Sequence, residues 1–442
     1  MDHGDAGSSG GGDASARLMP VLAGERIVSL DVLRGFAILG ILMMNVQSFG
    51  LPIMSSVMPT IAAGLDGFGL HAWLFTHTFF EFKFMSLFSI LFGAGIVVFA
   101  TRAARGGRSP AGLHYRRMVV LLGIGMLHAY AVWYGDILVA YSIIGMLVFL
   151  LRRLSVRWLI VLGGLFLLWP MVVNTTFGVL FVLMRNAYEL AQTQPEQVDG
   201  LTRSLVGGWE EILAEYAPSD VRLEQEIAAV RGSYADRFLF HLRYLIEGQT
   251  VGLLIYGVGR IGGLMLLGMA MLKSGVLSAQ RSDRFYRNLA IVSAFVGFPL
   301  IGLGAVRLAG SLFDPAETHL INGHFNYVGS VAVALCYLSL VMLAVRRGWG
   351  LRVQRWLAAV GRTALSNYLL QSLICATIFY GWGFGLFATM TRPELIGVVV
   401  AIWCVQITLS VWWLRVFRMG PMEWVWRWLS YGVRPSLLRN SG

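Results

Sequence analysis

Residues 32–50 read VLRGFAILGILMMNVQSFG, an apolar run long enough to cross a lipid bilayer as one helix. Similar runs follow near residues 74–100, 118–132, 137–151, 158–184, 249–272, 288–308, 326–345, 363–380 and 394–414. A segment in lipid must satisfy its own backbone hydrogen bonds, so runs of this length span the bilayer as helices. We therefore predict an all-α fold, a polytopic membrane bundle of about ten transmembrane helices.

The composition excludes a soluble enzyme of several domains. Hydrophobic residues make up 57% of the 442-residue chain and charged residues 13%, whereas soluble domains carry about 25% charged residues. The net charge of +11 comes almost wholly from arginine, since Lys83 and Lys273 are the two lysines. No basic block is interleaved with aromatic residues, so we expect no nucleic-acid partner. The three cysteines lie in apolar runs without CxxC spacing, and we expect no metal site.

The distribution of the arginines along the chain indicates the membrane topology. With both termini in the cytoplasm, 25 of the 35 basic residues fall on inside segments and seven fall outside, as the positive-inside rule requires. The predicted parts are a polar tail (1–24), five helices (25–184), an acidic outer loop (185–243), five more helices with an amphipathic C-terminal segment (244–432) and a short tail (433–442). We predict that the outer loop is a solvated connection, and the alternative is that it forms one or two amphipathic helices.

Polar residues in the spans are functional candidates because a charge at the bilayer centre costs about 2.5–3.5 kcal/mol. Asn45 follows Arg34 by eleven residues, which returns to nearly the same helix face about 16 Å further on. Asp31 begins this stripe at the cytoplasmic edge. Lys83 and His128 reach a similar depth from the second and third spans. The pattern indicates either a polar chamber with a titratable histidine or a structural hydrogen-bond network.

Further polar side chains lie at depth: His77 and Glu81 beside Lys83, Asp136 in an outer turn, Arg260, and Asn367 with Gln371 one turn apart. For Arg260 a structural pairing with a carbonyl or carboxylate is the favoured interpretation. Small residues at close spacing, Gly93 with Gly95 and Gly263 with Gly268, are expected to let helices pack closely.

Five blocks of sequence resemble the YeiB-like bacterial membrane proteins, a family of unknown function. The opening block is Ser29-Leu30-Asp31-Val32-Leu33-Arg34-Gly35-Phe36-Ala37 with Asn45, and the others fall within residues 83–95, 125–141, 361–372 and 420–427. The blocks occur in order over residues 26–432. The resemblance implies a multi-pass protein of the bacterial cytoplasmic (inner) membrane.

That family is similar to transmembrane acyltransferases, which include heparan-glucosaminide acetyltransferase and the O-antigen acetylases. These enzymes pass an acyl group from cytosolic acyl-CoA to an acceptor across the membrane, and their Leu-Arg-Gly helix matches residues 33–35 here. O-antigen acetylases carry a histidine eleven residues after that arginine, where this chain has Asn45, as the glucosaminide enzyme does. The glucosaminide enzyme's catalytic histidine matches His71 only loosely. His71, His77 and His128 therefore compete as the base, with His128 preferred because it falls in a YeiB-like block.

The resemblance implies a transfer of an acyl group, expected to be acetyl, to an extracytoplasmic or membrane-embedded acceptor. The expected catalytic residues are His128, Asp136, Asn45 and Lys83, and the residues expected at the acyl-CoA are Asp31, Arg34, Arg116, Arg117 and Arg362. His71, His77, Glu81, Arg260, Asn367 and Gln371 are expected to be substrate-binding or structural. The alternatives are a transporter of a small polar solute and a non-catalytic membrane scaffold. Partners would be the lipid bilayer and a small-molecule or glycan acceptor, with a homodimer as a candidate assembly.

Overall fold

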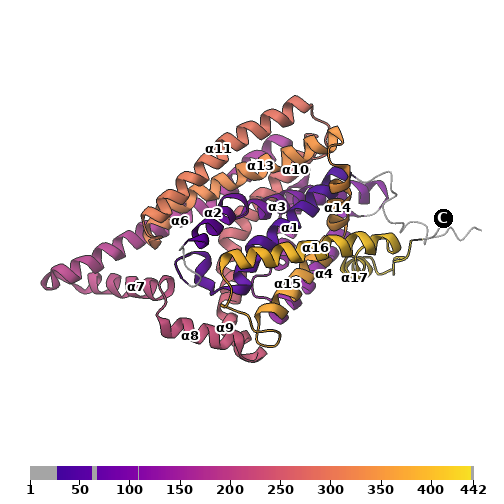
Figure 1. The fold of residues 1–442 in the computed structure, drawn as a ribbon. Helices are drawn as coiled ribbons and strands as arrows, with labels where there is room; N and C mark the ends of the chain where they lie inside the picture. Colours follow the sequence, from indigo (N-terminus) through magenta and orange to yellow (C-terminus); the bar gives the residue numbers. More distant parts are fainter. Residues whose placement is uncertain (1–26, 62–66, 108, 440–442) are drawn as a thin grey trace, which may run out of the picture.

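The computed structural model describes residues 27–61, 67–107 and 109–439, and over these ranges the chain forms an all-helical bundle without strands (Figure 1). The expected polar tail, residues 1–24, lies outside them. An isolated bridge between Phe417 and Leu438 folds the C-terminal segment back on the end of a helix. The segment 433–439, predicted to be a tail, is thus attached to the bundle.

In the described part of the chain, seven helical stretches are long and apolar enough to cross a membrane, which makes this a multi-pass membrane protein. They are α1 (Val28–Gly50), α2 with α3 (Phe68–Phe79 and Lys83–Arg105), α6 (Val156–Thr193), α9 through α10 (Tyr234–Glu247 to Gly263–Lys273), α11 (Asp283–Gly310), α12 with α13 (Pro315–Glu317 and Gly323–Arg347) and α16 (Arg392–Val416). The other three predicted spans fall on α4 (Pro110–Ala131), α5 (Leu138–Phe149) and α15 (Ala364–Phe379). The count of ten spans stays a prediction.

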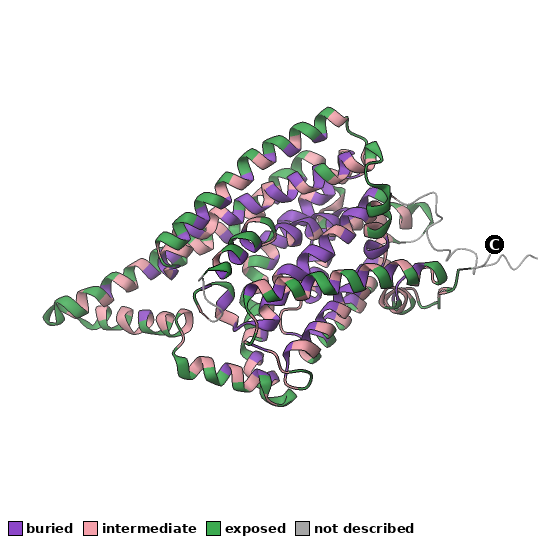
Figure 2. Ribbon diagram, in the orientation of Figure 1, coloured by how far each residue is buried: buried purple, intermediate pink, exposed green. Residues whose placement is uncertain are grey.

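The centre of the bundle is α1, which is buried almost all round (Figure 2). Its Leu33, Ile38 and Leu42 are fully buried, and it packs against α3, α13, α14 (Leu351–Arg362), α15 and α16. The surrounding helices cover its mostly apolar surface, and they carry their own exposed apolar faces outward. The first span of the sequence is therefore the core of the fold.

Glycines bring two helix pairs into backbone contact. A Cβ on Gly35 of α1 would lie 1.8 Å from the carbonyl oxygen of Leu357, and one on Gly361 of α14 would lie 1.9 Å from that of Asp31. In the same way, a Cβ added to Gly93 of α3 would lie 2.0 Å from a backbone carbonyl oxygen of α10. One added to Gly268 of α10 would lie 1.9 Å from a backbone carbonyl oxygen of α3. The expectation of close helix packing is confirmed for Gly93 and Gly268.

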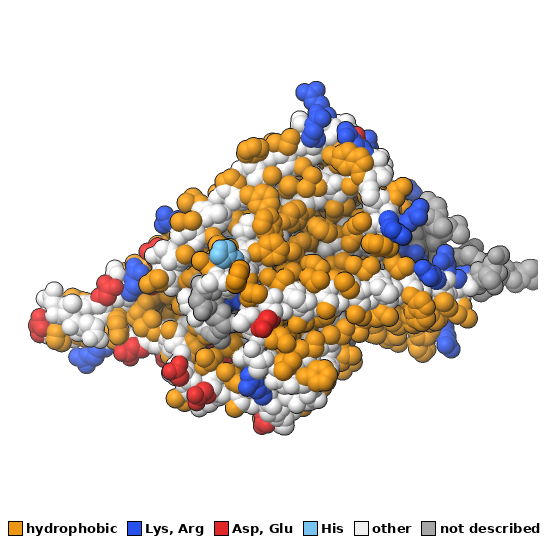
Figure 3. All heavy atoms as spheres, viewed as in Figure 1, with side chains coloured by type: hydrophobic (Ala, Val, Ile, Leu, Met, Phe, Trp, Pro, Cys, Tyr) orange, Lys and Arg blue, Asp and Glu red, His pale blue; other side chains and the backbone are white. Residues whose placement is uncertain are grey.

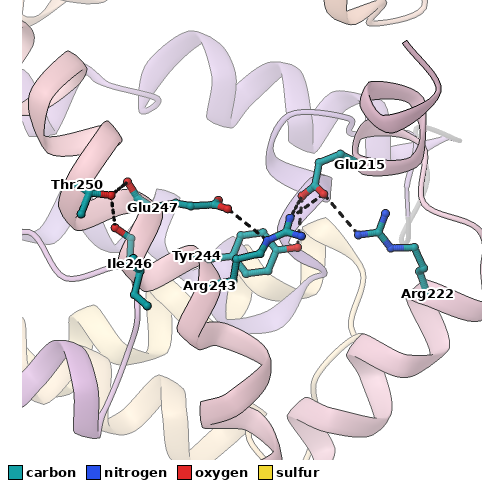
Figure 4. Close-up of polar contacts among 7 residues, drawn as sticks. All are labelled: Glu215, Arg222, Arg243, Tyr244, Ile246, Glu247 and Thr250. Carbon is teal, nitrogen blue, oxygen red and sulfur yellow. Dashed lines mark hydrogen bonds and ion pairs between the residues drawn. The ribbon is translucent and has the colours of Figure 1, made fainter. Parts of the chain in front are cut away.

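The acidic segment predicted as a loop is helical. After α6 it forms α7 (Gly200–Tyr216), α8 (Asp220–Arg231) and α9, each begun by a side-chain cap, from Asp199, Ser219 and Ser233 respectively. The prediction of a solvated loop is wrong because caps and ion pairs compensate for the low hydrophobicity. Glu215 of α7 accepts hydrogen bonds from Arg243 at 2.7 Å and from Arg222 at 3.4 Å (Figure 4).

Helix α8 is attached to the end of α1 and to the loop before α16. Glu226 accepts a hydrogen bond from the backbone N–H of Ile53 at 2.8 Å, and Arg231 donates to the carbonyl of Phe387 at 2.8 Å. Burial raises the pKa of Glu226 to about 7, although the hydrogen bond from Ile53 acts in the opposite direction and lowers it. The three helices α7, α8 and α9 thus form a cap, which we call the outer cap.

Charge separates the two ends of the molecule. Figure 3 shows many Lys and Arg side chains at the end that carries α14 and α17 (Pro421–Tyr431), and acidic side chains over the outer cap at the opposite end. This distribution is the one that the positive-inside rule gives for a cytoplasmic end with α14 and α17.

We predict that Gly93→Ala lowers the free energy of unfolding by about 3 kcal/mol or more, because its methyl group has no room against the backbone of Met265. The matched control is Gly95→Ala on the same helix, where nothing lies within 4 Å and the change should stay within about 1 kcal/mol. Thermal unfolding in detergent measures both. Equal stability of the two variants would contradict the α3–α10 contact.

A second prediction concerns pH. The folded state holds the Glu226 proton more tightly than the unfolded chain, whose pKa is near 4.5, so stability is highest below pH 4.5 and falls as the pH rises to about 7. The loss amounts to about 3 kcal/mol at most. Unfolding followed from pH 4.5 to 8 should show this slope in the wild type and a flatter profile in Glu226→Gln. An unchanged slope in the variant would assign the pH dependence to other groups.

Candidate functional site

A histidine and an aspartate form a buried pair where α4 ends and α5 begins. His128 lies in the last turn of α4, and its Nδ1 is 2.9 Å from Oδ1 of Asp136. The Asp136 carboxylate also accepts the backbone N–H groups of Leu138 and Val139, both at 3.1 Å, and so caps α5. Because the carboxylate is an acceptor, this hydrogen bond requires a proton on Nδ1. The carboxylate therefore orients the histidine ring.

The surroundings of the pair are aromatic. The ring of Tyr368 on α15 lies 5.2 Å from that of His128, and the ring of Trp133 lies 6.4 Å away. The Nε2 atom of His128 is buried and has no hydrogen-bond partner among the described residues. A shallow apolar groove of about 280 Å³ between α4 and α9 is lined by Leu127, Tyr130, Ala131, Tyr234 and Phe238. One of its lining residues, Leu127, directly precedes His128 in the sequence.

A second polar cluster surrounds Lys83 at the start of α3. Its ammonium donates to Oδ1 of Asn326 on α13 at 2.8 Å and to the backbone carbonyl of His77 at 2.5 Å. The His77 ring in turn lies 2.5 Å from a carboxylate oxygen of Glu81 and stacks on Trp73. Together with Arg260, which is described next, the predicted site residues His77, Glu81 and Lys83 are neighbours here.

Arg260 joins the same cluster from the helix between α9 and α10. Residues Gly248–Gly262 have wide i→i+5 helical turns, and Arg260 lies in the last of them. Its guanidinium donates to the carbonyl of Tyr327 at 3.0 Å and to the hydroxyls of Ser86 at 3.0 Å and Ser330 at 2.7 Å. Phe82, which has a left-handed φ of 64°, places its ring over the guanidinium.

The structure does not join Asn45, Lys83 and His128 in one hydrogen-bonded chamber. No hydrogen bond connects any two of them in the part of the chain that is described, and Asn45 is half-buried without a side-chain partner there. Equal depth along three helices does not fix the direction in which each side chain points. However, Phe49, one turn after Asn45, stacks on Trp133 at 4.5 Å, so Asn45 lies one helical turn from a residue that packs on Trp133.

The residues expected at a CoA head group occupy the end with α14 and α17. Arg34 pairs with Asp31 at 3.0 Å and is partly exposed. Arg117 lies between the rings of Phe99 and Trp426, each 4.4 Å from its guanidinium carbon. The guanidinium of Arg116 lies beside Gly432 at the end of α17, and Arg362 donates to the carbonyl of Arg418. Arg117 thus holds α17 against α4, whereas Arg116 is exposed and Arg34 is about one-third exposed.

Asn367 and Gln371 join helices. Asn367 donates to Thr363 and to Ser410, both at 2.9 Å, while Gln371 donates to Gln406 at 2.9 Å and to the backbone carbonyl of Ile38. These contacts link α15 with α16 and α1. His71, in contrast, is exposed in the first turn of α2 and contacts the carbonyl of Gly67 at 3.1 Å. It is not brought near any other candidate.

One residue not predicted to be at a site is central at the α14–α17 end. The Glu423 carboxylate accepts the backbone N–H groups of Leu365 (2.7 Å) and Ser366 (3.2 Å) and the Ser366 hydroxyl (2.5 Å). It therefore caps α15 from another helix, and burial raises its pKa while these bonds lower it. The two sequence blocks 361–372 and 420–427 meet here. The acid in the Gly420-Pro421-Met422-Glu423 block was the available signal.

Comparison with known proteins places the chain in a family. The chain is 32% identical over 434 residues to the uncharacterized protein YeiB of Escherichia coli K12, covering 94% of this chain and all of YeiB. The chain belongs to the YeiB-like DUF418 family. The DUF418 family model, described as a protein of unknown function, matches residues 271–433. The uncharacterized protein YxaH of Bacillus subtilis is 30% identical over 94% of this chain and 96% of its own. No solved structure matches.

The DUF418 region extends from the end of α10 through α17 and includes Asn367, Gln371 and Glu423, whereas the His128–Asp136 pair precedes it. Both YeiB and YxaH align with this chain over nearly its full length, so their similarity covers both halves of the bundle. Among the described residues no group of three His, Cys, Asp or Glu side chains could hold a metal ion.

We predict that Glu423→Ala destabilises this DUF418 protein by about 3 kcal/mol, because buried donors of α15 lose their acceptor. The control is Glu394→Ala, which removes an exposed cap of α16 and should cost clearly less. Thermal unfolding of both variants in detergent makes the comparison. A larger loss for Glu394→Ala would show that Glu423 does not hold the two helices together.

Proposed function

We propose that this protein is a transmembrane acyltransferase that moves an acyl group, acetyl in the simplest case, from cytoplasmic acyl-CoA to an extracytoplasmic or membrane-embedded acceptor. The observation that carries the proposal is the His128–Asp136 pair, with Nδ1 held at 2.9 Å and Nε2 without a protein partner. The proposed topology has ten spans with both termini in the bacterial cytoplasm. The basic end with α14 and α17 then faces the source of acyl-CoA.

In the proposed reaction, His128 Nε2 takes the proton of an acceptor hydroxyl or amine as that group attacks the acyl carbonyl carbon. A tetrahedral intermediate with an oxyanion forms, the carbon–sulfur bond breaks, and the CoA thiolate leaves and receives the proton from His128. Asp136 stabilises the imidazolium between these steps and holds it through its bonds to α5. The base is thus fixed by the same carboxylate that starts a helix.

Asn45 is the better candidate for stabilising the oxyanion, and Lys83 the weaker one. Asn45 is half-buried without a side-chain partner in the described chain, and it lies one turn below Phe49, which packs on Trp133 beside His128. Lys83 is engaged with Asn326 and His77 in the other cluster. An amide donor that is still free when substrate arrives can bind a developing charge.

The cytoplasmic part of the proposal rests on Arg34. Its guanidinium is about one-third exposed and lies on the same helix as Asn45, roughly 16 Å closer to the basic end. A CoA phosphate held by Arg34 and Arg116 would leave the pantetheine arm to follow α1 toward Asn45. Arg117 and Arg362 make contacts within the protein, with the Trp426 ring and the Arg418 carbonyl, and these contacts hold this end of the bundle together.

The test is acetyl transfer from radiolabelled acetyl-CoA to material extracted from native membranes, using protein purified in detergent. His128→Ala should lose transfer by about 10²–10⁴-fold and keep its affinity for acetyl-CoA, because the base acts on the acceptor. Arg34→Ala should weaken acetyl-CoA binding. Asp136→Asn should lower the rate and shift its pH profile.

The matched control is His114→Gln, which changes a buried histidine of the same helix that contacts only the carbonyl of Gly145 and nearby rings. It should leave transfer unchanged. Full transfer by His128→Ala would refute its role as base. Failure of the wild type to bind acetyl-CoA, or solute uptake into proteoliposomes without CoA, would refute the proposed function itself.

A further inference from the structure

The cluster around Lys83 and Arg260 contains two basic side chains and one carboxylate, that of Glu81. Both cations are fully buried, and the hydrogen bonds that they donate go to neutral acceptors, the carbonyls and side chains of Asn326, His77, Tyr327, Ser86 and Ser330. Glu81 is the carboxylate that interacts electrostatically with both, and it pairs with the His77 ring. With Lys83 protonated, one positive charge therefore has no counter-charge among the described residues.

The same side chains hold unused hydrogen-bonding atoms. The Nδ2 of Asn326, the Nε of Arg260 and the Nε2 of His77 are buried and lack partners among the residues described. The first two are donors, and each belongs to a residue at least nine-tenths buried. The N-terminus of α3, at Lys83, adds the positive end of a helix dipole. Charge and orphaned donors thus occur in one place.

Water explains only part of this arrangement. A buried water can satisfy orphaned donors, but it does not cancel a net charge, and a charge inside a bilayer is costly. Among the described residues, Glu81 is the one carboxylate that interacts with Lys83 and Arg260, so no second carboxylate balances a protonated Lys83. At the edge of the cluster lies Phe82, an exposed aromatic residue whose ring covers the Arg260 guanidinium. The backbone of Phe82 is left-handed, a conformation that is strained for a residue with a side chain.

We propose that Lys83, Arg260 and Asn326 form a binding site for a monoanionic oxyanion group, a carboxylate or a phosphate ester, that enters at the α2–α3 junction beside Phe82. The oxyanion accepts from the free donors of Asn326 and Arg260 and neutralises the excess charge. The site is distinct from the His128–Asp136 pair, and the proposal does not depend on acyl transfer. It binds the charged part of a ligand, which is either a soluble anion or an anionic lipid.

The first test observes Lys83 directly. Since the chain has two lysines, Lys273→Arg leaves Lys83 as the single source of a ¹⁵Nζ-lysine NMR signal in detergent. Sodium acetate or inorganic phosphate, added against sodium chloride of equal ionic strength, should move this signal in a saturable way. A missing ammonium signal, an unmoved signal with every anion including lipid, or an equal response to chloride would each overturn the proposal.

Stability separates binding from a structural role. Thermal unfolding of the wild type should rise with oxyanion concentration, and Lys83→Met, which removes the excess charge, should weaken this response at least about tenfold in concentration. Without added oxyanion, Lys83→Met should be no less stable than the wild type. A variant that is destabilised equally in all buffers would assign Lys83 to structure alone. Glu81→Gln, which raises the excess charge, should instead strengthen the response.

A third arm distinguishes the two sources of the oxyanion. The wild type and Lys83→Met are compared in nanodiscs of phosphatidylcholine with or without phosphatidylglycerol. Stabilisation by phosphatidylglycerol that disappears in Lys83→Met identifies an anionic lipid, whereas stabilisation by acetate or phosphate alone identifies a soluble ligand. A response that is the same in both proteins places the anion elsewhere and overturns the proposal.

Discussion

The bilayer offers no water to a buried charge, and this constraint explains where the polar groups of the protein lie. Almost all basic residues stay at the two ends of the bundle, and those inside it are surrounded by donors, acceptors and aromatic rings. Arg260 has three hydrogen-bond acceptors and two ring faces, and Lys83 has two acceptors. Asn367 and Gln371, both on α15, donate to side chains of α16. The His128–Asp136 pair leaves the Nε2 of His128 without a partner among the described residues.

The two polar clusters suit different tasks. His128 is held by a carboxylate that is itself fixed by two backbone N–H groups, which is a rigid environment for proton transfer. The Lys83 cluster lies where α2 breaks into α3 and where the helix before α10 widens, and both are irregular stretches of backbone. Irregular helices within a membrane are tolerated where polar groups compensate for them. The proposed roles follow from this difference: proton transfer at His128 and binding of a charged group at Lys83.

The sequence predicted the helices well because hydrophobic runs report burial in lipid directly. It also predicted the pairing partner of His128, since a tight turn between α4 and α5 leaves Asp136 close to it. It could not predict that Lys83 and His128 belong to different surroundings, because rotation about each helix axis depends on packing with distant helices. The outer cap was missed for another reason: its helices depend on caps and ion pairs such as Glu215 with Arg243, which hydropathy does not record. Glu423 illustrates the same limit, since its partners are 57 and 58 residues away.

The glycine contacts between α3 and α10, and between α1 and α14, also limit how the protein can move. Helices whose carbonyl oxygens would lie about 2 Å from an added Cβ interlock at the backbone, so they cannot slide past one another without separating first. Alternating access by rocking one half of the bundle against the other would have to break the Gly93–Gly268 seam, which joins an early helix to a late one. These two seams therefore act as a fixed frame within the bundle.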